Sequence, residues 1–133
     1  MSASPATVAR RWFEEIWNQR QIDLVDELMA PDAIGHVAPE EFRGPQGFRK
    51  MHATLCTAFP DQRIRVLAIA AEGENVFVHW EVKGTHHGPL HDVPASGKAF
   101  EVSGMTRFVV RDGKVLEGWD CWDTGKLLGR LRG

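Results

Sequence analysis

The sequence lacks most features that mark secreted, membrane-spanning or nucleic-acid-binding proteins. The 133 residues include only two cysteines, Cys56 and Cys121. No apolar run approaches the roughly 20 residues that span a bilayer, and the first residues lack the basic-then-apolar pattern of a signal peptide. The formal net charge of -2 gives no electrostatic reason to expect nucleic acid or an anionic membrane as a partner. We therefore expect a cytoplasmic protein with free thiols.

The chain has no internal repeat and no low-complexity tract. Hydrophobic residues make up 43% of it and charged residues 26%, which is ordinary for a globular protein. A chain of this length suits one hydrophobic core. We expect a single domain over residues 1–133.

Helical spacing dominates the first half of the chain. Ser4-Pro5 is typical of a helix start, and apolar side chains then recur every four residues, with an aromatic stripe that we interpret as core. A second helix is predicted over residues 24–29, ended by a following proline. Residues 33–39 are predicted to be irregular or a short strand. A third helix is predicted over residues 44–59.

After Pro60 the spacing changes to the period of two that is typical of strands. Asp112-Gly113 predicts a tight turn between the last two strands, and Asp123 or Thr124 can cap a short final helix. The predicted strands cover residues 64–71, 76–83, 100–110 and 113–123. Helices followed by four antiparallel strands predict an α+β fold, in which helices cover a curved sheet and enclose an apolar hollow.

Asp120 is the most suggestive residue for chemistry, because Trp119 and Trp122 flank it on the last predicted strand. Burial beside aromatic rings raises the pKa of a carboxyl group, which can then accept a proton and return it near neutral pH. The alternative is that Asp120 faces water at a strand edge, and the sequence favours neither. We interpret Asp123 as the cap of the final helix.

Seven short segments together resemble the SnoaL-like polyketide cyclases of the nuclear transport factor 2-like superfamily. They are residues 42–48 (FRGPQGF), 58–61 (AFPD), 84–88 (GTHHG), 94–98 (PASGK), 112–115 (DGKV), 119–120 (WD) and 127–128 (LL). The resemblance runs in order through nearly the whole chain. It implies a cone-shaped, curved antiparallel sheet covered by N-terminal helices, a cystatin-like α+β barrel.

The resemblance also implies a reaction, the cofactor-free closure of a ring by intramolecular aldol condensation on an apolar, carbonyl-bearing molecule. Asp120 matches the acid–base aspartate of these cyclases. A histidine that assists this aspartate in some of them corresponds here to Thr106, which can hydrogen-bond but cannot shuttle a proton. Two alternatives stay open. One is a non-catalytic small-molecule-binding protein, and the other is an isomerase or hydratase that uses the same aspartate.

Six residues are candidates for substrate binding around this catalytic aspartate: His36, His86, Trp80, Thr106, Phe108 and Trp119. His86 shares a strand face with Trp80 if the strand is unbroken, and otherwise braces the loop through a backbone hydrogen bond. His36 either reaches the mouth of the hollow or lies on a surface loop.

We expect neither a metal nor a cofactor. His87, His91 and Asp92 would need a helix to face one another, and Gly88-Pro89 prevents a regular helix there. We do expect a homodimer, because an open sheet with an apolar outer face favours being covered.

Overall fold

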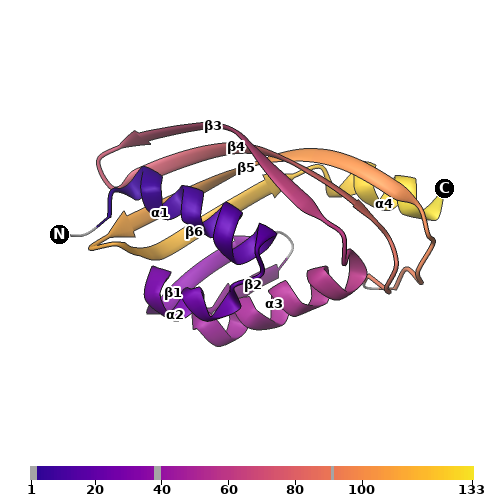
Figure 1. The fold of residues 1–133 in the computed structure, drawn as a ribbon, viewed down its shortest axis with the longest axis horizontal. Helices are drawn as coiled ribbons and strands as arrows, with labels where there is room; N and C mark the ends of the chain where they lie inside the picture. The colour runs from indigo at the N-terminus through magenta and orange to yellow at the C-terminus, as the bar shows by residue number, and fades with distance from the viewer. Residues whose placement is uncertain (1–2, 38–39, 91) are drawn as a thin grey trace.

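One curved six-stranded sheet forms the centre of the computed structural model, which describes residues 3–37, 40–90 and 92–133 (Figure 1). The strands lie in the order β2-β1-β6-β5-β4-β3. They are β1 (Met29–Val37), β2 (Glu40–Arg43), β3 (Arg63–Glu72), β4 (Asn75–Thr85), β5 (Ala99–Arg111) and β6 (Lys114–Trp122). The predicted α+β class and the four long strands of the second half are confirmed.

The first strand differs from the prediction in two ways. It begins at Met29, where a helix was predicted to continue, and it runs parallel to β6, so the sheet is mixed rather than wholly antiparallel. The register between β1 and β6 shifts between Met29 and Ile34, next to Pro31, as is common where a proline interrupts a ladder. Ala38 and Pro39, at the end of the predicted short strand, lie outside the described residues, as do residues 1, 2 and 91.

The first and last helices begin where their capping residues predict. Ser4 accepts a hydrogen bond from the Thr7 N–H at 3.2 Å, and Asp123 accepts one from the Lys126 N–H at 2.8 Å. The helical elements are α1 (Pro5–Arg11), η1 (Trp12–Asn18), η2 (Ile22–Leu24), α2 (Val25–Leu28), α3 (Gly44–Ala58) and α4 (Thr124–Arg132). The second, η1, continues α1 as a π-helix. None of the described helices has the length and apolarity needed to cross a bilayer.

Alternating burial along β4 and β5 gives the sheet an inner face that the helices cover. On that face Phe108 lies 5.6 Å from Trp12 and 6.1 Å from Phe13, measured between ring centroids. Phe48 of α3 joins the same cluster at 4.7 Å from Trp12. The α1–η1 helix therefore packs over β3, β4 and β5, and α3 packs over β1 and β2 (Figure 1).

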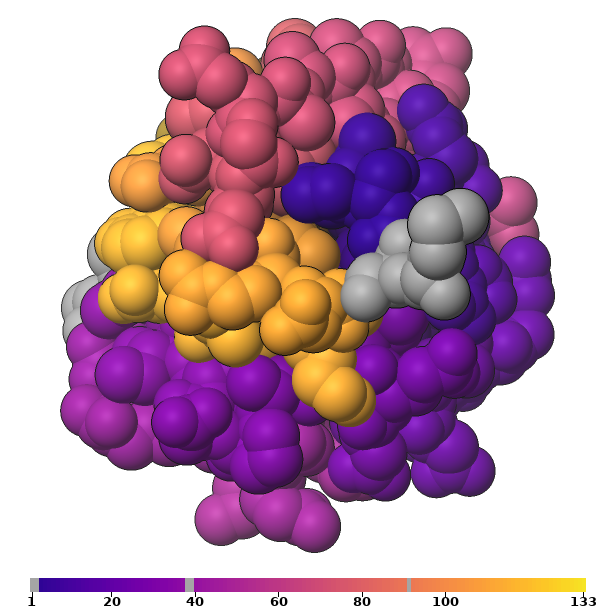
Figure 2. Space-filling model, turned by 90° about the vertical axis from the view of Figure 1, so that its left-hand side faces the viewer, coloured from indigo at the N-terminus to yellow at the C-terminus, as the bar shows by residue number. Residues whose placement is uncertain are grey.

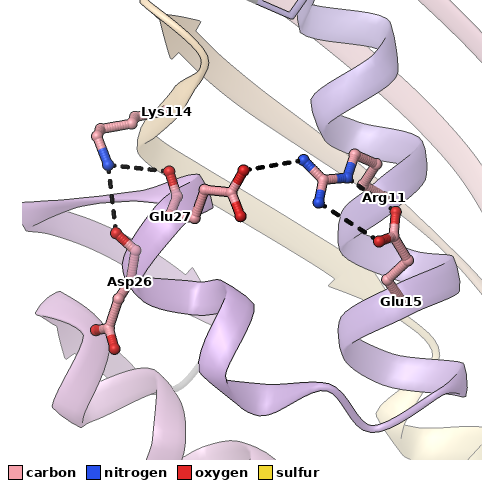
Figure 3. Close-up of polar contacts among 5 residues, drawn as sticks. All are labelled: Arg11, Glu15, Asp26, Glu27 and Lys114. Carbon is pink, nitrogen blue, oxygen red and sulfur yellow. Dashed lines mark hydrogen bonds and ion pairs between the residues drawn. The ribbon is translucent and has the colours of Figure 1, made fainter.

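At one end of the molecule, polar contacts connect β6 to the early helices. Figure 2 shows this end, where the start of α1 lies beside the β5–β6 turn. The ammonium group of Lys114 donates to the carbonyl oxygens of Asp26 at 3.3 Å and Glu27 at 2.9 Å (Figure 3). Arg11 forms ion pairs with Glu15 and Glu27. These contacts hold the start of β6 against α2, and β6 carries the candidate catalytic residue.

The β5–β6 connection is the tight hairpin turn that the sequence predicts. Asp112 and Gly113 have φ angles of +53° and +76°. Two successive positive φ angles are typical of a type I′ turn, whose twist matches that of the strands it joins. The turn pairs Arg111 with Lys114, and a register shift between Val109 and Val110 then places Asp120 opposite Thr106.

Candidate active site

Asp120 lies on the inner face of β6, between Thr106 of β5 and Val37 of β1 in the sheet register. The Thr106 hydroxyl donates to Asp120 Oδ1 at 2.5 Å. The same hydroxyl oxygen accepts a hydrogen bond from Trp80 Nε1 at 2.9 Å. Three adjacent strands thus each contribute one side chain to a short hydrogen-bonded chain that ends at the carboxyl group.

A narrow hollow with two adjoining lobes lies between the sheet and the helices. Both lobes are lined by Phe13, Trp17, Val37, Met51 and Asp120. Their cavity volumes are about 40 and 60 Å³, which is room for a few water molecules. A ring-sized ligand therefore needs some of the aromatic side chains to turn.

The surroundings of Asp120 change its acidity. Burial among apolar groups raises the pKa of the Asp120 carboxyl from 3.8 to about 6, while the hydrogen bond from Thr106 opposes that rise. Asp120 as a whole residue is only half-buried, but the carboxyl group loses enough hydration that the effect of burial on its pKa exceeds that of the hydrogen bond. A carboxyl that titrates near pH 6 can both accept and return a proton close to neutral pH.

Three of the predicted substrate-binding residues line the hollow, namely His36, Trp80 and Phe108. Phe108, 5% exposed, borders the first lobe, and Trp80, 6% exposed, borders the second. Thr106 is buried and contacts Asp120, but it does not line either lobe. Its position is thus behind the carboxyl group, away from a ligand in the hollow.

The predicted pair of flanking tryptophans is divided between the two faces of β6. Trp122 lines the second lobe, because a residue two positions from Asp120 shares its face. Trp119 lines neither lobe, and its ring lies 4.6 Å below the Arg107 guanidinium. Of the two indoles, only Trp122 contributes to the apolar surroundings of the carboxyl in the hollow.

His36 borders the first lobe, but its ring is engaged with neighbouring side chains. It stacks on Trp119 at a centroid distance of 5.3 Å. Its Nε2 lies 2.6 Å from Glu117 Oε2, and its Nδ1 lies 3.1 Å from Glu41 Oε2. With both ring nitrogens beside carboxylates, this histidine is not placed to exchange a proton with Asp120.

His86 is fully buried, yet it lies outside both lobes. Its ring packs against Phe59, and its Nδ1 accepts a hydrogen bond from the Ser96 backbone N–H at 3.2 Å. This is the loop-bracing position that the sequence left open. Of the three residues considered as metal ligands, His91 lies outside the described residues. No group of three or more histidine, cysteine or acidic residues in the described part of the chain could hold a metal ion.

Several lining residues were not predicted as part of the site. Phe13 and Trp17 belong to the aromatic stripe that was interpreted only as core, and they are buried and line the hollow at once. Gln62 is the second polar side chain in the second lobe, where it is 7% exposed. Its amide donates only a weak contact to the Cys56 sulfur at 3.9 Å. A single glutamine after a turn gives no sequence signal of this position.

Comparison with known proteins adds a family and a set of structural relatives. A family model described as SnoaL-like polyketide cyclase matches residues 7–131. No match was found among curated proteins. A candidate SnoaL-like polyketide cyclase from Jannaschia sp. CCS1 is 26% identical, with a TM-score of 0.89, over 98% of this chain and 96% of that one.

Two Streptomyces proteins are also similar in structure. IdmH, a candidate polyketide cyclase from Streptomyces antibioticus, is 26% identical over 98% of this chain and 100% of its own, with a TM-score of 0.84. AclR, a candidate hydroxylase from Streptomyces galilaeus, is 25% identical over 96% of this chain and 95% of its own, also with a TM-score of 0.84.

Proposed function

Because the chain belongs to the SnoaL-like polyketide cyclase family, we propose that it closes a ring by intramolecular aldol condensation, with Asp120 as the acid–base group. The observation that carries this proposal is a carboxyl group with a pKa of about 6 at the junction of two apolar lobes. The substrate is a neutral, apolar molecule with neighbouring carbonyl groups. Among the described residues, Asp120 and His36 are the only ionisable ones that line the two lobes, which suits an uncharged ligand.

In the proposed reaction, Asp120 removes one proton from the substrate and later returns it. The Asp120 carboxylate takes a proton from a carbon between two carbonyl groups, and the electrons of that C–H bond form an enolate. The enolate carbon attacks a second carbonyl carbon, a C–C bond forms, and the carbonyl oxygen becomes an alkoxide. Asp120 returns its proton to that oxygen, so the carboxylate is regenerated.

The remaining lining groups hold the substrate in the reactive conformation. Aromatic side chains on both sides of Asp120 keep the two reacting carbons close, which lowers the entropic part of the barrier. The Gln62 carboxamide, weakly hydrogen-bonded in the second lobe, is available to bind a substrate carbonyl or hydroxyl group. We therefore assign Gln62 to orientation of the substrate.

The proposal is tested with a neutral aromatic methyl ester that carries two β-related ketones. We expect wild-type protein to exchange the proton between the ketones with D2O, followed by proton NMR, and to form the cyclic product. Asp120→Asn should lower both rates about 100- to 10,000-fold, the usual contribution of a general base. Asp123→Asn is the matched control, because Asp123 caps α4 and lines neither lobe. Unchanged turnover in Asp120→Asn would reject the mechanism.

A second candidate function is the binding of an apolar molecule without its conversion. It is favoured by the absence, among the described residues, of a hydrogen-bonded proton carrier next to Asp120, since Thr106 cannot act as one. It predicts a ligand retained in native mass spectrometry and no product. An isomerase or hydratase is the third alternative, because one fold can host different reactions at the same aspartate. Deuterium exchange without ring closure would favour it.

A further inference from the structure

The direction of the hydrogen bonds behind Asp120 is fixed by chemistry. An indole N–H can only donate, so the oxygen of Thr106 must accept from Trp80 across their 2.9 Å contact. The hydroxyl has one hydrogen, and its only other described partner is Asp120 Oδ1 at 2.5 Å. The Thr106 hydrogen therefore points at Oδ1 in every arrangement that satisfies both contacts.

From this we infer that Trp80 and Thr106 are positioning residues that reserve the Oδ2 oxygen of Asp120 for proton transfer. A proton on Oδ1 would face the hydrogen of Thr106, whereas a proton on Oδ2 leaves that hydrogen bond intact. The inference rests on the proposed function for its catalytic meaning, but the hydrogen-bond chain itself does not. It replaces the substrate-binding role expected for Thr106 and adds a second role to that of Trp80.

The fold provides a specific site for this chain of contacts. Trp80 pairs with Gly104 across the β4–β5 ladder, and its ring extends over Gly104 to reach Thr106. A Cβ atom on Gly104 would lie 2.6 Å from the Trp80 ring and 2.7 Å from Trp122 Cβ. Only a residue without a side chain leaves room for the indole in that position. Because Thr106 is 3% exposed, water does not compete for its hydroxyl.

The hydrogen bonds from Trp80 to Thr106 and from Thr106 to Asp120 also affect the acidity of Asp120. A hydrogen bond donated to a carboxylate favours the ionised form, so Thr106 opposes the effect of burial on Asp120. Donation from Trp80 draws electron density from the Thr106 oxygen and makes its O–H a better donor. Removing either residue should therefore make Asp120 a weaker acid.

The inference is tested by titrating the side-chain carbon of Asp120 with ¹³C NMR, with the signal assigned from Asp120→Asn and no substrate present. Thr106→Val should raise the midpoint by about one pH unit, the effect of one hydrogen bond. Thr106→Ser keeps a hydroxyl and should restore the wild-type midpoint. An unchanged or lower midpoint in Thr106→Val would overturn the inference.

Trp80→Phe tests the hydrogen bond from Trp80 to Thr106 separately. Loss of the indole N–H should raise the midpoint, whereas entry of water into the space that the smaller ring leaves would lower it. Trp122→Phe is the matched control, because Trp122 lines the same lobe 6.1 Å from Trp80 and makes no contact with Thr106 among the described hydrogen bonds. A rise in Trp80→Phe but not in Trp122→Phe supports the inference, and the reverse contradicts it.

A third measurement uses the wild-type protein, so it involves no substitution and no effect on folding. The Trp80 indole N–H resonance should shift with the same midpoint as the Asp120 carboxyl, because the Thr106 hydroxyl connects them. An indole resonance that does not follow this titration would reject the chain of contacts. Because these measurements involve no turnover, they can succeed while ring closure fails, and a failed titration test leaves the aldol proposal standing.

Discussion

At the scale of single residues, the charge of Asp120 links the chemistry of the hollow to the stability of the fold. Its pKa in the folded protein, about 6, exceeds the ordinary value of 3.8. Between these two pH values the folded state holds a proton that the unfolded state releases. Stability is therefore greatest below pH 3.8 for this group, and it declines as the pH rises through 6.

Asp120→Asn should remove this pH dependence. The amide is neutral at every pH, and its oxygen can still accept the Thr106 hydrogen bond. The variant should match the wild type near pH 3.5 and exceed its free energy of unfolding by up to about 3 kcal/mol above pH 7, since the pKa difference is about two units. Urea denaturation at the two pH values measures the difference. A variant that is less stable at pH 8 would contradict the burial of a charged carboxyl.

The pH profile of catalysis follows from the same group. The proposed reaction begins with ionised Asp120, so kcat/KM should rise with pH and level off above a midpoint near 6. Steady-state assays from pH 4.5 to 8 measure the profile. A rate that falls as the pH rises through this range would mean that the acid form starts the reaction.

At this scale the catalytic role of Asp120 stays a prediction, and its surroundings were predicted in part, since Trp80 and Phe108 line the hollow. Asp120 stands between two tryptophans in the sequence, but strand alternation places these on opposite faces of β6. Trp122 lines the hollow, whereas Trp119 stacks on His36. The hydroxyl of Thr106 was expected to contact a ligand and instead contacts the carboxyl. Such contacts depend on which strands are neighbours in the sheet, and a single amino-acid sequence does not show the order of the strands.

At the scale of secondary-structure elements, local signals were sufficient for most boundaries. Ser4, Asp123 and the Asp112-Gly113 turn predicted two helix starts and one hairpin, because caps and tight turns depend on residues within a few positions. The first part of β1 was missed, since Met29 continues the pattern of the preceding helix, while residues 33–39 were predicted to be irregular or a short strand. Its partner in the sheet, β6, lies far along the chain, and no local pattern predicts a parallel pairing at that distance.

The Trp80 ring of β4 lies directly against Gly104 of β5, and this contact predicts the effect of a side chain at Gly104. Gly104→Ala would place a methyl group within 3 Å of the Trp80 ring and should lower the free energy of unfolding by about 1–3 kcal/mol. Gly129→Ala in α4 is the control, because no atom lies within 4 Å of the added carbon and alanine favours the helix. Urea denaturation should show opposite signs for the two variants. Equal effects would mean that the indole moves without cost.

At the scale of the whole molecule, the homodimer expected from the sequence stays a prediction. Phe77 and Met105 are 47% and 55% exposed on neighbouring strands, and they alternate with residues of the buried inner face. Apolar side chains of this size on an outer sheet face favour association with a second copy. Light scattering coupled to size exclusion should give twice the chain mass, and Phe77→Glu with Met105→Lys should give the monomer mass. A wild-type monomer at micromolar concentration would reject the dimer.

The parallel contact between β1 and β6 has a consequence for synthesis on the ribosome. Val37 pairs with Asp120, so β1 cannot join the rest of the sheet until the last strand has left the exit tunnel. Bringing such distant segments together carries a large loop-closure entropy, which slows folding. Until then β1 has no partner on the side that β6 will occupy, and the strand that joins the two parts of the sheet also carries Asp120.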